Sequence, residues 1–179
     1  LTSNEKITKY TPEHICYCMF NPKKTNGYVL YLMEKNNNFR IGITPLWSKS
    51  QHSSLTFRAK QEQCDKFWVL DYFENKFEAH TEEQYNSLIF SVPQLIFKDR
   101  TDRNDKQNSI EKFYNRFDKS KILNNVKLLL EKFNRKYDYP LWEKNKFNYF
   151  SKRSLFEINA CNILPSVMLL KHFNENKFQ

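Results

Sequence analysis

The stretch TNGYVLYLMEKNNNFRIGIT, residues 25–44, decides the fold that we predict. It contains two apolar runs, at 28–33 and 39–43, which are joined only by Glu, Lys and three Asn. β-branched and aromatic residues favour strands, and Asn tolerates the left-handed backbone conformation that a tight turn requires. The sequence therefore predicts a β-hairpin, in which Gly42 marks a place where another group approaches the backbone closely.

The segments after the hairpin alternate between helical and strand patterns. Helical spacing predicts a helix at 55–65, with Ser54 at its start, and the run KFWVLDYF at 66–73 is the most strand-like of the chain. A second helix follows from 74 and must end before Pro93. The expected buried faces of the two helices are Leu55, Ala59 and Gln63, and Phe77, His80 or Thr81, Gln84 and Leu88. The predicted order is strand, strand, helix, strand, helix.

The flanks of this unit have different patterns. Residues 7–20 predict two short strands with a break at Thr11, before a proline. A charged stretch at 98–108 predicts a linker, and amphipathic helices are expected at 109–120 and 121–137. An aromatic, basic loop and a helix-like stretch from Ser154 to Pro165 complete the chain. The apolar stripe of the second amphipathic helix is Ile122, Val126, Leu129, Leu130 and Phe133. The predicted class is α+β, a small antiparallel sheet flanked by helices, with a helical appendage and β-rich flanks.

Charge points to a class of partner. The 179-residue chain has a formal net charge of +9 and a pI near 9.3, which favours a polyanion such as DNA or RNA because bound phosphates release counterions. The alternatives are that the lysines are solvated surface, or that their number reflects an AT-rich genome. The four cysteines, at 16, 18, 64 and 161, lack metal-ligand spacing. No membrane-length apolar run or signal peptide is present, so we expect a soluble, intracellular, cytoplasmic protein with no membrane partner.

Two tripeptides of the hairpin resemble the motifs of the GIY-YIG nuclease core. Val29-Leu30-Tyr31 is similar to the first, and Arg40-Ile41-Gly42, followed by Thr44, is similar to the second, nine positions later. The element order and the stretch HTEEQYNSLIF extend the likeness to about 65 residues. The resemblance implies a GIY-YIG-like sheet with the order β-β-α-β-α.

The resemblance also implies roles for single residues. Tyr31 would polarise or deprotonate the attacking water, Arg58 would stabilise charge on the scissile phosphate, and Glu83 would hold Mg²⁺ or Mn²⁺. Phosphodiester hydrolysis requires such groups in any fold: an oxygen-ligated cation, guanidinium donors and a group that activates water.

The chain departs from the family pattern in three places. Arg40 replaces the tyrosine of the second motif and could provide a second phosphate contact. No histidine or tyrosine follows Arg58 at the family's position, and no asparagine follows Pro93. Glu82 remains an alternative to Glu83 as metal ligand.

Thr11-Pro12-Glu13-His14 resembles the T-x-x-H motif of the Hint domain of inteins, in which the threonine and the histidine assist the first acyl shift. The stretches LYLMEKNNNFRIGIT, EQYNSLIFSVPQLIF and INACNILPSVMLL are similar to those of inteins that carry this kind of nuclease insert. The chain has neither an opening Cys or Ser nor a terminal His-Asn pair. The resemblance thus implies an interior portion of an intein, or a degenerate or trimmed intein, with a host protein flanking it.

These observations lead to an expected function and two alternatives. We expect a homing-type endonuclease that cuts double-stranded DNA, with a Hint-like flank at 1–26, a nuclease core at 27–97, a helical DNA-contacting region at 98–150 and a return segment at 151–179. Basic groups position DNA backbone and aromatic groups can stack on bases, or the aromatics are simply core. The alternatives are a noncatalytic DNA-binding insert and a structural fragment of a splicing element with no DNA role. The expected nucleic-acid contacts are Arg40, Lys60, Lys121, Lys127, Lys146, Lys152 and Arg153.

Overall fold

The computed structural model describes residues 15–19, 27–46, 54–99, 101, 103–138, 140–144 and 155–159. Thr11, His14, Lys146, Lys152 and Arg153, which the sequence singled out, lie outside the described residues. In chain order the elements are β1 (Ile15–Met19), β2 (Tyr28–Lys35), β3 (Asn38–Pro45), α1 (Ser54–Glu62), β4 (Lys66–Phe73), α2 (Lys76–Phe90), α3 (Asn104–Tyr114), α4 (Lys119–Lys132), β5 (Trp142–Glu143) and β6 (Leu155–Asn159). The α+β class and the predicted order from β2 to α2 are confirmed.

The hairpin forms as the opening stretch predicts. β2 and β3 pair antiparallel, from Tyr28 opposite Pro45 to Lys35 opposite Asn38. The two turn residues, Asn36 and Asn37, have φ values of 50° and 57°. A two-residue turn that matches the strand twist needs positive φ at both positions, which Asn tolerates better than most residues.

The main sheet has the strand order β3-β2-β4-β5, with all neighbours antiparallel. β2 is central in the hairpin-plus-strand unit, and its pairing with β4 shifts register between Leu30 and Tyr31. Such a bulge re-aims side chains locally and is common next to active sites. Tyr31 therefore lies in β2 directly beside the irregular position of this strand pair.

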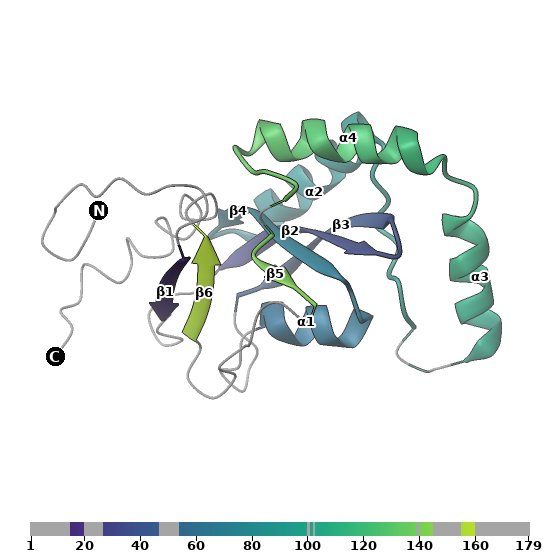
Figure 1. Cartoon of the computed structure of the whole chain (residues 1–179), viewed down its shortest axis with the longest axis horizontal. Helices are drawn as coiled ribbons and strands as arrows, with labels where there is room; N and C mark the ends of the chain where they lie inside the picture. Colours follow the sequence, from purple (N-terminus) through teal and green to yellow (C-terminus); the bar gives the residue numbers. More distant parts are fainter. Residues whose placement is uncertain are drawn as a thin grey trace, which may run out of the picture.

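β1 and β6 form a separate two-stranded antiparallel sheet, drawn at the left of Figure 1. β6 lies within the stretch from Ser154 to Pro165 for which a helix was predicted, so that prediction is wrong for Leu155–Asn159. Residues far apart in sequence supply the backbone partners here, and such pairing overrides local helical spacing. Along the chain, the main sheet and its helices lie between β1 and β6.

Helices cover both faces of the main sheet, with α2 and α4 above it and α1 below it in Figure 1. α1 and α3 bury their apolar residues on the face that carries Val29, Tyr31 and Met33. The opposite face, with Leu30 and Leu32, packs against α4. The predicted α4 stripe is buried at Ile122, Val126, Leu129 and Leu130 and partly buried at Phe133. α4 thus shares the core of the sheet.

The predicted buried face of α2 is wrong. Phe77 and Leu88 are 78% and 76% exposed, whereas Ala79, Glu83 and Asn86 are buried. Small Ala79 permits a close approach to the sheet. Asn86 satisfies its buried amide through the Glu82 carbonyl, at 2.6 Å, and the Lys132 ammonium, at 2.7 Å. Polar residues whose hydrogen bonds are met can face a core that the hydrophobic pattern would not predict.

Two smaller predictions are also corrected. Gln63 is exposed and lies beyond the end of α1 with φ of 53°, so the last buried residue of this helix is Glu62. α3 begins at Asn104, inside the stretch predicted as a linker, and ends at Tyr114. Its first turn is polar and exposed, and only Ile110 and Tyr114 are buried, which is why the apolar spacing placed its start too late. None of the described helices combines the length and apolar character that a bilayer span requires.

Candidate active site

Tyr31 and Gly42 face each other across β2 and β3. The Tyr31 side chain is 1% exposed, and its ring stacks on Phe67 with centroids 5.0 Å apart. A Cβ atom built on Gly42 would lie 2.5 Å from the Tyr31 hydroxyl and 2.8 Å from Nη2 of Arg40. Since any side chain would fill this position, Gly42 provides the space in which the phenol and the guanidinium converge.

Arg40 lies next to this space in a buried ion pair. Its Nη1 donates to Oε1 of Glu62 on α1, and its guanidinium carbon lies 5.6 Å from the centre of the Tyr31 ring. Glu62 also accepts the backbone N–H of Phe97, at 3.1 Å, through Oε2. Burial alone would lower the pKa of Arg40, but the nearby Tyr31 and Glu62 raise it overall, so the guanidinium stays charged. The pair ties β3 to α1 and to the segment after α2.

The Tyr31 phenol is protonated at neutral pH. Burial raises its pKa to about 12, and Glu62 and Glu83 act in the same direction, while Arg40 and Arg58 oppose the shift. The phenol is therefore a poor proton acceptor in this state and can still accept a hydrogen bond through its oxygen.

Glu83 lies on the buried side of α2, which packs against β2 and β3. It is 8% exposed, and its Oε2 lies 3.2 Å from Nδ1 of His80, one turn earlier on the helix. Burial raises the pKa of Glu83, against the influence of His80, Arg40 and the Ile43 backbone on β3. The charge of Glu83 in turn raises the pKa of Tyr31.

Glu82, the neighbouring candidate, points to different partners. Its Oε2 accepts a hydrogen bond from the Asn86 amide at 3.1 Å and lies 3.9 Å from the Lys132 ammonium of α4. Of the two glutamates, Glu83 is the one whose charge raises the pKa of Tyr31.

Arg58 completes the cluster from α1. It is partly buried, its charge acts on Tyr31, and among the described residues it forms no ion pair. Arg58 and Glu62 are four positions apart, so they lie on the same side of the helix. The structure thus brings Tyr31 and Arg40 close together over Gly42, whereas Arg58 on α1 and Glu83 on α2 are related to them only through the influence of their charges on the pKa of Tyr31.

Two residues of this cluster were not predicted from the sequence. Glu62 lies four positions after Arg58, and His80 lies three before Glu83. Helical spacing alone would have placed each pair on one face, but nothing in the sequence indicated that Glu62 pairs with Arg40 on a strand 22 residues earlier.

The carboxylate of Glu83 is the kind of oxygen ligand that a magnesium ion prefers. Mg²⁺ takes hard oxygen ligands, keeps several waters and is often held by one or two carboxylates together with substrate phosphates. Within the described residues, no group of three or more His, Cys, Asp or Glu side chains could form a complete metal site. Glu83 would contribute a carboxylate oxygen to such an ion, together with water and substrate phosphate.

The other predicted nucleic-acid contacts that the structure describes, Lys60, Lys121 and Lys127, do not form one surface. Lys60 is exposed on α1, and Lys121 and Lys127 are exposed on α4, on the opposite face of the sheet. Arg135, a further basic residue after α4, is 4% exposed and donates to the carbonyls of Val69 and Leu70, so it is a structural residue of the core.

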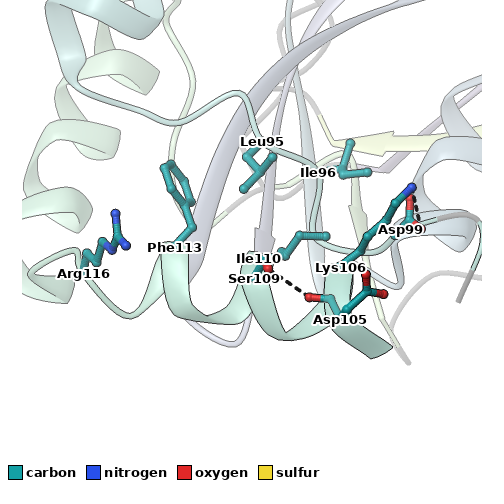
Figure 2. A pocket seen from close by; sticks show the side chains of 9 residues that line it. All are labelled: Leu95, Ile96, Asp99, Asp105, Lys106, Ser109, Ile110, Phe113 and Arg116. Atoms are coloured by element: carbon teal, nitrogen blue, oxygen red, sulfur yellow. Dashed lines mark hydrogen bonds and ion pairs between the residues drawn. The ribbon is translucent and has the colours of Figure 1, made fainter. Parts of the chain in front are cut away.

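Two pockets lie beside α3, and neither is lined by Tyr31, Arg40, Arg58 or Glu83. Figure 2 shows the larger one, of about 590 Å³, where Phe113 and Ile110 of α3 face Leu95. An ion pair between Lys106 and Asp99, at 3.7 Å, lies at one end and Arg116 at the other. The smaller pocket, of about 330 Å³, is polar and adjoins the hairpin turn.

Comparisons with protein-family models, curated proteins and solved structures found no match for this chain.

Proposed function

We propose that the chain is an intein-associated, homing-type DNA endonuclease that hydrolyses a phosphodiester bond with a divalent cation. The observation that carries the proposal is the convergence of the Tyr31 hydroxyl and Arg40 over Gly42, with Arg58 and Glu83 within electrostatic reach of the phenol. A phenol beside a guanidinium, with the charges of a second guanidinium and of a carboxylate acting on that phenol, supplies the kinds of group that phosphodiester hydrolysis requires. The GIY-YIG-like element order supports the same interpretation.

The pairing of β1 with β6 supports the intein part of the proposal. Strands from both flanks form one small sheet, and residues 27–144 lie between them in sequence. That arrangement is expected of a nuclease inserted into a scaffold whose two halves pair with each other. Thr11 and His14 would belong to this scaffold, with a host protein on its outer sides.

In the proposed reaction, the oxygen of a water molecule forms a bond to phosphorus while the bond to one ester oxygen breaks, and the proton that the water gives up to solvent is balanced by the proton that the leaving oxygen takes up from solvent. The Tyr31 hydroxyl orients the water by accepting its hydrogen bond, and the Arg40 charge favours the phenolate against burial. Arg58 donates to the phosphoryl oxygens, where negative charge increases in the transition state. Mg²⁺ or Mn²⁺, held by Glu83, would supply further stabilisation of that charge.

A second candidate function, a noncatalytic DNA-binding insert, rests on the burial of the same groups. Tyr31 is 1% exposed with a pKa near 12, and Arg40 is 6% exposed and paired with Glu62. A site of this kind could keep the family's fold while losing its chemistry. DNA affinity without metal-dependent cleavage distinguishes this candidate.

The experiment that tests the proposal is cleavage of a supercoiled plasmid library in Mg²⁺ or Mn²⁺, with EDTA as the metal-free control. Arg58→Ala should bind DNA but lose cleavage. Of the two arginines, Arg40 is paired with Glu62, whereas Arg58 has no ion-pair partner among the described residues and can donate to a phosphate. Gln61→Ala, on the same helix, should cut as the parent does. Salt-dependent binding by a parent that never cuts would select the noncatalytic insert instead.

A further inference from the structure

The smaller pocket beside α3 combines the hairpin turn with the start of α4. Its lining includes Lys35 and Asn38 of the hairpin, Gln107 and Glu111 of α3, and Lys119 of α4. Two lysines and one glutamate therefore line a polar concave space of about 330 Å³. The cationic groups outnumber the anionic one, which favours an anion as the occupant.

Both ammonium groups are held by neutral acceptors. Lys35 donates to the Glu62 carbonyl at 3.3 Å, and Lys119 donates to Oδ1 of Asn38 and to the Tyr114 carbonyl. Neither forms a salt bridge among the described residues. An ammonium has three donors, so each keeps at least one N–H for a further acceptor.

Burial lowers the pKa of both lysines, since each ammonium has lost part of its hydration. The charges of Lys98 and Lys144 also act on Lys35, while Asp65 opposes them. An anion placed in the pocket would replace lost hydration with charge-assisted hydrogen bonds.

We propose that this pocket binds a phosphate group of the nucleic-acid backbone through Lys35 and Lys119. This inference rests on the proposed function for the identity of the ligand and adds a contact point that is separate from the candidate active site. Asn38, at the pocket, and Gly42, at the active site, are four residues apart on β3, which is roughly 14 Å in a strand.

The first test uses inorganic phosphate and does not depend on DNA. In an NMR titration at constant ionic strength, phosphate should shift the amide signals of Asn36 and Asn38 in the parent, while chloride should not. In the double variant Lys35→Gln/Lys119→Gln, the phosphate concentration that gives half of the full shift should rise at least tenfold. Lys76→Gln/Lys112→Gln removes the same charge from exposed positions outside the pocket and should respond as the parent does. An unchanged response in the pocket variant overturns the proposal.

A variant that is expected to bind phosphate more tightly shows that a change in affinity does not simply reflect a damaged fold. Glu111→Gln removes the carboxylate that lines the pocket and should make phosphate bind severalfold more tightly. Weaker binding in this variant would contradict the assignment.

The second test measures affinity for a labelled DNA duplex by fluorescence anisotropy over a series of salt concentrations. Lys35→Gln/Lys119→Gln should reduce the magnitude of the slope of log K against log[salt] by about 1, because one phosphate contact is lost. The control variant Lys76→Gln/Lys112→Gln should change the slope less. An equal slope in parent and pocket variant counts against the DNA contact. If the parent does not bind DNA at all, the proposed function fails, while the phosphate titration still decides whether the pocket is an anion site.

Discussion

The buried ion pair between Arg40 and Glu62 should dominate the stability of the candidate active site. Arg40→Met replaces the guanidinium with an apolar chain of similar length and leaves the Glu62 carboxylate, in a residue that is 1% exposed, without its counter-charge. Removing one partner of a buried pair costs about 3–5 kcal/mol. That is a large fraction of the roughly 5–15 kcal/mol by which a typical domain is stable. In a chain of 179 residues, it corresponds to a loss of about 6–20 °C in Tm.

The double variant Arg40→Met/Glu62→Gln separates the charge from the packing. The amide that replaces the Glu62 carboxylate would keep an oxygen for the Phe97 N–H, which Glu62 now accepts at 3.1 Å, and would carry no charge. Most of the lost stability should therefore return, since neutral replacements of both partners are often tolerated. A double-mutant cycle should give a coupling energy of about 2 kcal/mol or more.

Urea unfolding of the parent, both single variants and the double variant measures these values, provided that the m-value is unchanged. Glu82→Gln is a suitable control, because the Glu82 carboxylate lies 3.9 Å from the Lys132 ammonium and the two side chains are 40% and 37% exposed. Such a partly exposed pair should contribute about 1 kcal/mol or less. Additive effects of Arg40→Met and Glu62→Gln, or a single Arg40→Met variant as stable as the parent, would refute the reasoning.

Three further predictions concern the site and its helix. Gly42→Ala places a methyl group 2.5 Å from the Tyr31 hydroxyl, so it should destabilise the fold by about 1–3 kcal/mol and abolish cleavage; a variant that cuts normally would show that the space over Gly42 is not needed. The folded pKa of Tyr31, near 12, lies above its ordinary value of 10.0, so this residue's contribution is complete below pH 10 and is lost as the pH rises toward 12. Two pKa units correspond to about 2.7 kcal/mol. Between pH 8 and pH 11, the free energy of unfolding measured in urea should decline less for Tyr31→Phe than for the parent. Equal declines would mean that the pKa of Tyr31 is not raised in the folded protein. Phe77→Ser, at a position 78% exposed, should leave stability within about 0.5 kcal/mol of the parent, whereas Ala79→Leu, at a position 0% exposed, should cost about 1–3 kcal/mol; thermal melts that reverse this order would contradict the orientation of α2.

Local signals predicted most of the sheet and its adjoining helices. The asparagines at the turn and the apolar runs beside them predict the hairpin, because turn chemistry and strand propensity act over a few residues. The run KFWVLDYF predicts β4 with the same bounds as the structure, Lys66–Phe73. The α4 stripe was also predicted, since helical spacing of four apolar residues has no competing explanation there.

Features that depend on distant partners could not be predicted in the same way. Leu155–Asn159 has a helix-like pattern and becomes a strand because β1 pairs with it. The face of α2 that packs on the sheet holds Ala79, Glu83 and Asn86, whose burial depends on close approach and on partners such as Lys132. The Arg40–Glu62 pair joins a strand to the end of a helix 22 residues later, and no periodicity indicates that contact. Hydrophobic pattern therefore predicts apolar cores well and buried polar cores poorly.

Glu83 and Glu82 provide the most direct test of the proposed endonuclease, because they are adjacent, equally charged and differently oriented. The measurement is the rate of nicking or cutting of a plasmid library in Mg²⁺ or Mn²⁺ by the parent, Glu83→Gln and Glu82→Gln, with DNA binding followed in parallel. We predict that the parent and Glu82→Gln cut, and that Glu83→Gln binds equally well but is slower by at least a hundredfold. Equal rates for all three proteins, or no metal-dependent cutting by a parent that binds the DNA, would contradict the assignment of Glu83 as the catalytic metal ligand.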